Sequence, residues 1–196
     1  EYLSEFRTVL DQYDCVTIGE APLITTSRAL DFIGGKDPEL DMMIPFQCME
    51  GDCFLLDYLH HPFCLVKLKH IWQRWQKALR GKGWNFLYIE NHDHPRVISR
   101  YGSEKYNTES GKALAASYLF QEGTPVVYQG QEIGMTNIYP KTIDGYEDVQ
   151  TINQYHHFFT HKSEKKRMRR IYWGSRDSAR TPVQWDGSAN AGFTTG

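Results

Sequence analysis

The sequence predicts an α/β fold in which helices connect parallel strands. Helix-like and strand-like segments alternate from residue 2 to residue 130, as is typical of a parallel sheet with crossover helices. The 196 residues are 40% apolar, enough for one domain with a sizeable core. Two strand-like segments end in acidic residues, Glu20 and Asp93, and chemistry in parallel α/β folds collects at the carboxyl ends of strands.

The first half of this alternation begins with a helix. Residues 2–10 place their apolar side chains on one helical face, and residues 15–20 read as a strand that ends in Glu20. A short helix is predicted over residues 23–30. A second strand is predicted over residues 40–46, although the proline at position 45 weakens it.

The second half contains the clearest amphipathic helix. Its apolar residues recur at spacings of three and four over residues 65–79, and Gly81 is its predicted stop. A strand is predicted over residues 84–91, a helix over residues 110–121 and a last strand over residues 124–130.

After the last strand the alternation ends. Residues 131–175 are predicted to be an irregular polar segment, a loop or helical excursion. Its basic run, residues 165–170, could bind phosphate, but a solvated helix face is favoured because the formal net charge of the chain is −2. The adjacent His156 and His157 lack a third ligand, so no metal site is predicted.

Composition excludes other classes of protein. Nothing in the overall charge favours nucleic acid or a membrane surface, and no apolar run approaches the ~20 residues of a membrane span. Free, buried thiols in a reducing compartment are expected, which favours a cytoplasmic location. The cysteines are Cys15, Cys48, Cys53 and Cys64. Because the chain starts at Glu1 inside a predicted helix, it looks truncated, and a missing signal peptide says nothing about location.

The apolar run at residues 86–89 leads into a polar tip that contains His92 and Asp93. On this stretch alone a site and an ordinary turn are equally supported. Retaining cleavage of a glycosidic bond needs two carboxyls about 5 Å apart, and Glu20 with Asp93 could supply such carboxyls. An apolar strand around Glu20 would raise its pKa, as a general acid needs; a helix cap or an arginine partner is the alternative.

Four stretches, taken in order, resemble one enzyme family. They are residues 18–20, 90–96, 123–137 and 176–185. Together they look like the alpha-glucosidase and oligo-1,6-glucosidase branch of the alpha-amylase superfamily, glycoside hydrolase family 13. The likeness covers nearly the whole chain.

This resemblance implies a TIM (β/α)8 barrel, of which residues 1–196 would be the C-terminal half with strands five to eight. Position by position, Glu20 matches the family's general acid/base, and Asp93 the carboxylate that stabilises the transition state. His92 matches a histidine that hydrogen-bonds the bound glucose, and Arg176 an arginine of the same pocket. The resemblance implies an oligosaccharide substrate and no cofactor.

Departures from the family pattern are equally informative. The family nucleophile is an Asp in an Arg-x-Asp context, and the sequence before Glu20 has no such match. We therefore expect a fragment that needs the N-terminal barrel half of the same enzyme and is inactive alone. His94 stands where Gln is common in the family, and Cys48 where His is common, which bears on fine specificity.

In the leading interpretation, this chain is part of a retaining α-glucosidase that acts on short malto- or isomalto-oligosaccharides. Within the class, a trehalose-6-phosphate hydrolase, a sucrose isomerase or another transglucosylase is the alternative. A non-catalytic relative acting as a structural or interaction subunit is a second interpretation, which the joint presence of Glu20, Asp93 and their partners disfavours. A nucleic-acid module built on residues 165–170 ranks last.

Overall fold

The computed structural model describes residues 1–54 and 56–195, with side chains at residues 1–52 and 61–195. The chain divides into two compact units, and each is described by itself. Unit 1 comprises Glu1–Gly51, Cys64–Tyr88 and Ser117–Val126, and unit 2 comprises Asp52–Phe63, Ile89–Ala116 and Val127–Gly196.

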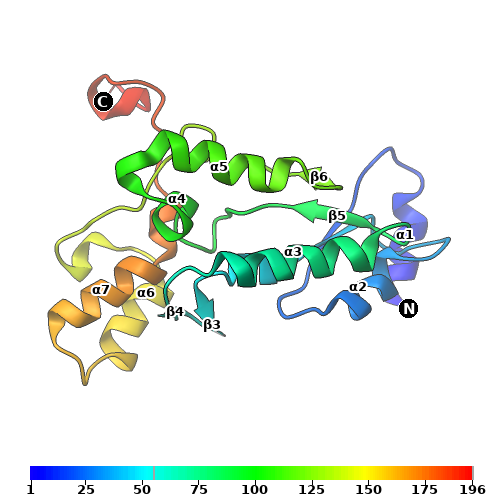
Figure 1. Cartoon of the computed structure of the whole chain (residues 1–196), viewed down its shortest axis with the longest axis horizontal. Coiled ribbons are helices and arrows are strands. Elements are labelled where there is room, and N and C mark those ends of the chain that lie inside the picture. Colours follow the sequence, from blue (N-terminus) through cyan, green and yellow to red (C-terminus); the bar gives the residue numbers. More distant parts are fainter. Residues whose placement is uncertain (55, 196) are drawn as a thin grey trace. The chain divides into compact units, whose positions relative to one another are not determined.

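Unit 1 is built on the parallel sheet that the sequence predicts (Figure 1). Its order is β1-β2-β5-β6, and each neighbouring pair is parallel. The strands are β1 (Ile18–Glu20), β2 (Met42–Ile44), β5 (Trp84–Leu87) and β6 (Thr124–Pro125). Because all four strands run the same way, their carboxyl ends lie at one edge of the sheet.

The helices of unit 1 begin and end where local chemistry requires. They are α1 (Tyr2–Leu10), α2 (Thr26–Ile33) and α3 (Leu65–Leu79), with a 3₁₀ turn at Phe46–Met49. The Thr25 hydroxyl caps α2 by accepting the Arg28 N–H at 3.3 Å. Gly81 follows the end of α3 at φ +68°, the left-handed conformation that a glycine adopts at no steric cost, so the predicted stop is confirmed.

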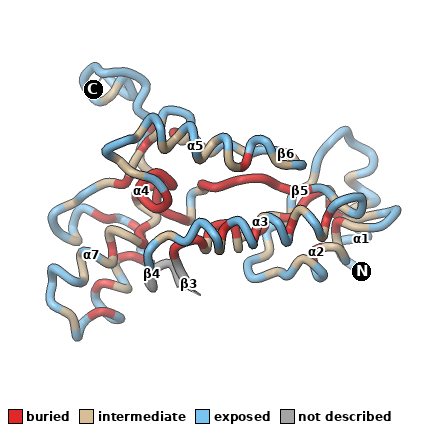
Figure 2. The backbone as a smooth tube through the Cα atoms, viewed as in Figure 1, coloured by how far each residue is buried: buried red, intermediate tan, exposed pale blue. Residues whose placement is uncertain are grey.

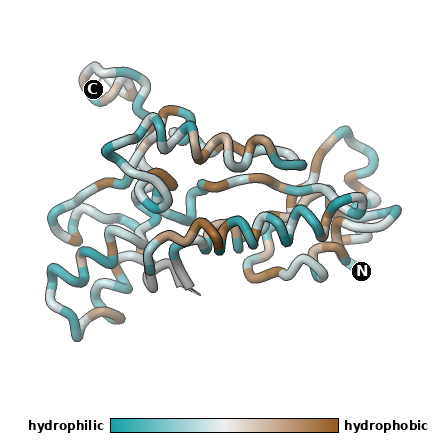
Figure 3. Tube along the Cα trace, viewed as in Figure 1, coloured by the Kyte–Doolittle hydropathy of each residue, from teal (hydrophilic) through white to brown (hydrophobic). Residues whose placement is uncertain are grey.

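Apolar side chains of α2 and α3 form the main core of unit 1. Along α3, apolar and polar residues alternate with the helical period (Figures 2 and 3). Leu68, Ile71, Trp75 and Leu79 are buried, whereas Leu65 and Val66 in the first turn are exposed. Ala29, Ile33, Ile71, Trp75 and Leu79 form one cluster with residues of β2 and the following turn. A second cluster joins Phe86 and Tyr88 to Met42 and Met49.

The last two strands are shorter than predicted. The expected strand over residues 84–91 ends at Leu87, and the one over residues 124–130 ends at Pro125. β6 is an edge strand with a single neighbour, and Pro125 has no N–H to continue the ladder. Beyond them the chain turns, since Gly130 adopts φ +85°.

Unit 2 contains helices within the segment that the sequence predicts to be a loop or helical excursion after the last strand. Within residues 131–175 lie α6 (Val149–Asn153), a π-helical turn (Gln154–Phe158) and α7 (Glu164–Gly174). Buried apolar residues of these elements and of the turns beside them form a small core. Its buried members are Tyr146, Tyr155, Phe159 and Ile171. These helices are short and mostly polar, so the sequence shows too few apolar residues to reveal a helical period.

The remaining elements are short. β3 (Cys53–Phe54) and β4 (Leu56–His60) form an antiparallel pair in unit 2 that the sequence analysis missed. The helix α4 (Val97–Tyr101) was also missed, and α5 (Asn107–Leu119) begins earlier than predicted. Short 3₁₀ turns lie at Glu104–Tyr106, Ile143–Gly145, Arg176–Ala179 and Ala189–Gly192. Within the described residues, the helices lack the combined length and apolar character that crossing a membrane demands.

The cysteines are less buried than expected. Cys48 is buried, and its burial raises the pKa of its thiol to about 12. Cys15 and Cys64 are exposed, because Cys15 precedes the edge strand β1 and Cys64 stands just before α3. The Cys53 side chain lies outside the described residues.

Candidate active site

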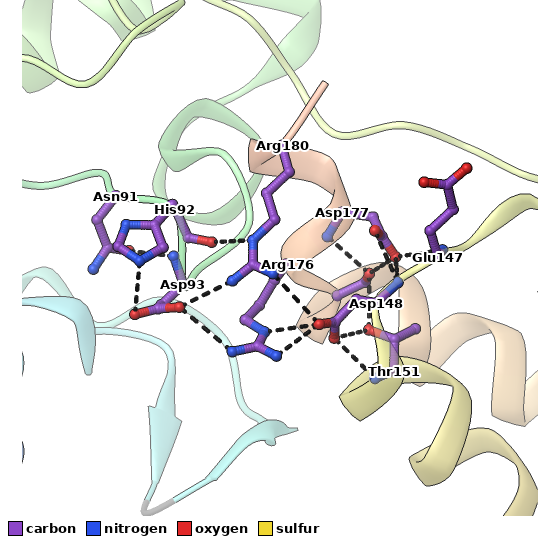
Figure 4. A network of polar contacts seen from close by, with 10 residues as sticks. Asn91, His92, Asp93, Glu147, Asp148, Thr151, Arg176, Asp177 and Arg180 are labelled. Atoms are coloured by element: carbon purple, nitrogen blue, oxygen red, sulfur yellow. Dashed lines mark hydrogen bonds and ion pairs between the residues drawn. The ribbon is translucent and has the colours of Figure 1, made fainter. Parts of the chain in front are cut away.

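The structure divides the sequence-predicted site residues between the two units. Glu20 is the last residue of β1 in unit 1, at the carboxyl edge of the sheet. His92 and Asp93 lie in the loop after β5, and Arg176 lies in a 3₁₀ turn after α7, all three in unit 2. Unit 2 brings these three residues together (Figure 4).

Glu20 is more exposed than the sequence predicts. An apolar strand suggested a partly desolvated carboxyl, whereas Glu20 is exposed, as is Ile18 on the same strand. The physical reason is the position of β1, which is the first strand of the sheet and has one neighbour. The expected desolvation is therefore wrong for this chain.

The polar tip after β5 is a turn and a candidate site at once. The Asn91 side-chain oxygen accepts the Asp93 N–H at 3.1 Å and lies 2.9 Å from Nδ1 of His94. This Asx turn fixes the backbone on both sides of His92. His94 is buried, while His92 is exposed with Nε2 3.5 Å from the Asp93 carboxylate.

Two arginines hold the Asp93 carboxylate. Oδ1 lies 3.1 Å from Nη2 of Arg180 and 3.5 Å from Nη1 of Arg176. Arg180 also donates its Nε–H to the His92 carbonyl at 2.9 Å, so it ties the loop to the segment after α7 (Figure 4). The Asp93 side chain remains 25% exposed, so it can still meet a ligand.

A second carboxylate, Asp148, anchors these arginines from the other side. Its Oδ1 lies 2.6 Å from Nη2 of Arg176 and 3.5 Å from Nη1 of Arg180. Its Oδ2 accepts the N–H and the hydroxyl of Thr151, each at 2.9 Å. We call His92, Asp93, Asp148, Arg176 and Arg180 the Asp93 cluster.

The Asp148 carboxyl titrates abnormally. Burial works to raise its pKa, but the hydrogen bonds from Arg176 and from the Thr151 N–H and hydroxyl, together with the Arg176 charge, outweigh burial, so the pKa is lowered. A carboxyl whose pKa is lower in the folded state stabilises the fold above its unfolded pKa, and that stability is lost as pH falls through the folded pKa.

We therefore expect Asp148→Asn to lower the urea midpoint of unfolding at pH 7, with a deficit that shrinks below about pH 4. The cause is the loss of an ionised acceptor for Arg176. Unfolding titrations at pH 7 and pH 3 measure this difference, and Asp144→Asn, outside the cluster, is the control. A deficit that is larger at pH 3 than at pH 7 would contradict the assignment.

A buried arginine fixes the loop that carries Asp93. Arg96 is fully buried, and its Nη1 donates to Oε1 of Glu90 at 2.6 Å and to the Gln129 carbonyl at 2.7 Å. Its Nε donates to the Ser178 carbonyl at 3.2 Å, within the turn that holds Arg176. Glu90 also accepts the first N–H of α4, that of Val97, at 2.9 Å.

Sequence reasoning assigned no role to Arg180 and Asp148 of the cluster, or to Asn137, which contacts Arg96. Arg180 lies in a stretch quoted for the family resemblance, but no role was assigned to it. No local pattern in the sequence marks Asp148 as a site residue, because its partner Arg176 is 28 positions away. Asn137 lies in a stretch that resembles oligo-1,6-glucosidases, yet it is buried and accepts the Arg96 backbone N–H at 2.8 Å, which is a structural role.

The Asp93 cluster suits recognition of a neutral polyol. It offers a partly exposed carboxylate, an imidazole and guanidinium N–H groups within one small region, and such groups form hydrogen bonds with sugar hydroxyls. The carboxylate also places negative charge where a developing cation would be stabilised. Among the described residues, no group of three or more His, Cys, Asp or Glu side chains is arranged to hold a metal ion.

Comparison with known proteins gives a consistent result. The family model "Alpha amylase, catalytic domain" matches residues 1–196. Oligo-1,6-glucosidase of Parageobacillus thermoglucosidasius is 43% identical over 203 residues, which cover 100% of this chain and 36% of the relative. Trehalose-6-phosphate hydrolase of Bacillus subtilis is 40% identical over 205 residues, with the same coverage.

Solved structures agree with the sequence relatives. The crystal structure of Bacillus licheniformis trehalose-6-phosphate hydrolase superposes with a TM-score of 0.93 at 38% identity, covering 100% of this chain and 36% of that one. Trehalulose synthase from Pseudomonas mesoacidophila gives a TM-score of 0.91 at 35% identity, covering 99% and 36%. The chain thus spans about a third of the length of the relatives it matches.

Proposed function

The chain belongs to the alpha-amylase catalytic-domain family, and on that premise we propose that it supplies the acid/base and glucose-holding residues of a retaining α-glucosidase. The substrates would be short oligosaccharides with a terminal α-linked glucose. The parallel sheet of unit 1 is the part of a (β/α)8 barrel that contains strands five to eight.

The Asp93 cluster is the observation that carries this proposal. It presents Asp93, His92 and Arg176 together, the three positions that the family resemblance assigns to the bound glucose. Glu20 stands at the carboxyl end of a parallel strand, where barrel enzymes place catalytic groups. A non-catalytic relative would have no need to keep all four residues.

The proposed mechanism assigns each residue one step. Glu20 protonates the leaving glycosidic oxygen, and an aspartate from outside these 196 residues forms the covalent glucosyl intermediate. Glu20 then removes a proton from the incoming water. Throughout, Asp93 stabilises the positive charge that develops on the glucose ring, while His92 and Arg176 bind its hydroxyls.

A graft tests this proposal. The 196 residues replace the matching segment of Parageobacillus thermoglucosidasius oligo-1,6-glucosidase, and the rest of that enzyme is kept. By the family resemblance, the retained part is expected to supply the other barrel half and the nucleophile. We expect the graft to release glucose from isomaltose and from an aryl α-glucoside, with the anomeric configuration retained. A folded graft without turnover would favour the non-catalytic interpretation.

The isolated chain gives the complementary prediction. We expect no glucose release from an aryl α-glucoside by residues 1–196 alone, because they contain no Arg-x-Asp before Glu20 and four strands cannot close an eight-stranded barrel. Sustained release of glucose by this polypeptide, at a rate above that of its Glu20→Gln variant, would refute the proposed division of roles.

A further inference from the structure

Unit 2 contains a cavity that is separate from the Asp93 cluster. Its volume is about 570 Å³, within the range of small-molecule sites. We call it the α7 cavity, and its lining residues used below are Phe63, Lys162, Lys166, Arg169, Arg170 and Trp173. None of the residues that line it belongs to the Asp93 cluster.

The α7 cavity is lined by cationic groups. Lys166, Arg169 and Trp173 are spaced by three and four residues, so they share one face of α7. Lys162 adds a further ammonium from the turn before the helix. Within the part of the chain that the structure describes, the side chains of Lys162, Lys166 and Arg169 make no hydrogen bond or ion pair. Three positive charges therefore remain available to a ligand.

Among the described residues that line the cavity, Asp52 is the one carboxylate, and it does not offset these charges. Asp52 is held by Arg100, with Oδ1 2.6 Å from Nη2 and Oδ2 3.1 Å from Nε. Both side chains are at least nine-tenths buried. This pair is neutral as a whole, so the cavity keeps a positive field that attracts an anion.

Aromatic side chains give the cavity an apolar part. Trp173 comes from α7, and Phe63 is stacked on Tyr101 with ring centroids 4.6 Å apart. Packing by Tyr101 holds the Phe63 ring in one orientation. Flat aromatic surfaces of this kind accommodate the apolar face of a sugar ring, while lysine and arginine bind phosphate oxygens.

We propose that the α7 cavity binds a phosphomonoester carried on a sugar ring. Lys162, Lys166 and Arg169 hold the phosphate, and Trp173 packs against the ring. A nucleic acid fits less well, because the basic residues line a cavity and the whole chain has a formal net charge of −2. The site is independent of the proposed glucosidase chemistry.

Calorimetric titration of residues 1–196 with glucose 6-phosphate, inorganic phosphate and glucose tests this proposal. We expect glucose 6-phosphate to bind most tightly, inorganic phosphate more weakly and glucose without measurable affinity. Binding should weaken as salt is added, because the contacts are ionic. Glucose 6-phosphate that binds no better than glucose or inorganic phosphate would overturn the proposal, as would tighter binding of a single-stranded oligonucleotide.

Paired variants locate the site. Lys166→Gln and Arg169→Gln each remove a charge from the cavity and should weaken glucose 6-phosphate binding about tenfold or more. Lys165→Gln also removes one positive charge from α7, but Lys165 is not among the residues that line the cavity. The affinity of this variant for glucose 6-phosphate should therefore equal that of the unaltered chain. An equal loss in all three variants would show a nonspecific effect of charge and overturn the assignment.

Discussion

Glu20→Gln in the oligo-1,6-glucosidase graft is expected to lower kcat on isomaltose by about 10²–10⁴-fold. Glutamine has nearly the shape of glutamic acid but cannot give a proton to the leaving oxygen or take one from water. Glu20 is exposed at the end of an edge strand, so the substitution removes no buried contact of unit 1. Steady-state kinetics on folded graft protein measure the effect.

The leaving group separates proton transfer from structural damage. A nitrophenyl leaving group departs without protonation, so the first step of Glu20→Gln should be far less impaired on that substrate than on isomaltose. Glu5→Gln, on the exposed surface of α1, is the matched control and should leave kcat unchanged. An equal loss of kcat/KM, which reports the first step, on both substrates would contradict a role for Glu20 in donating the proton.

Arg96→Met is expected to lower the free energy of unfolding by about 3–5 kcal/mol. The side chains of Arg96 and Glu90 are 0% and 1% exposed, and methionine would leave the Glu90 carboxylate buried without its partner. The Gln129 and Ser178 carbonyls would lose their donor as well. Urea unfolding of residues 1–196, followed by circular dichroism, measures the loss.

The pH dependence of this variant has a definite sign. Burial, partly offset by Arg96, raises the pKa of Glu90 above its ordinary value. Without Arg96 the pKa of Glu90 rises further. The buried, ionised carboxylate then lowers the free energy of unfolding at high pH, and this loss becomes smaller as the carboxylate is protonated at lower pH. The deficit of Arg96→Met should thus be smaller at pH 5 than at pH 8.

Arg80→Met is the control for the same chemical change. Arg80 and Glu122 form an ion pair 3.4 Å long with side chains 76% and 46% exposed. An exposed pair of this kind contributes about 0–1 kcal/mol, so the midpoint should barely move. Equal losses in Arg80→Met and Arg96→Met would contradict the special role of the buried pair.

Local patterns were sufficient for the parallel sheet and its main helix. The three- and four-residue spacing of apolar residues predicted α3, and Gly81 predicted its end, because both features act within one turn of helix. Motif order then placed Glu20 at the end of β1 and Asp93 in the loop after β5. Strand lengths were overestimated, because the extent of a strand depends on which strands pair with it, and local patterns do not show that pairing.

The rest of the site depends on contacts between distant positions. Arg96 forms a hydrogen bond with Ser178, which is 82 positions away in the sequence. Arg180 forms one with Asp93, which is 87 positions away. Asp148 reads in the sequence as an ordinary polar residue of a loop. Its role exists only because α6 brings it to Arg176, and no local spacing encodes that meeting.

A crystal structure of the graft with glucose bound would test the central claim most directly. The account predicts that the carboxyl groups of Glu20 and Asp93 lie on the same glucose unit, with His92 and Arg176 within about 3 Å of its hydroxyl oxygens. Glucose bound elsewhere, or these two carboxyl groups at opposite ends of the barrel, would contradict it.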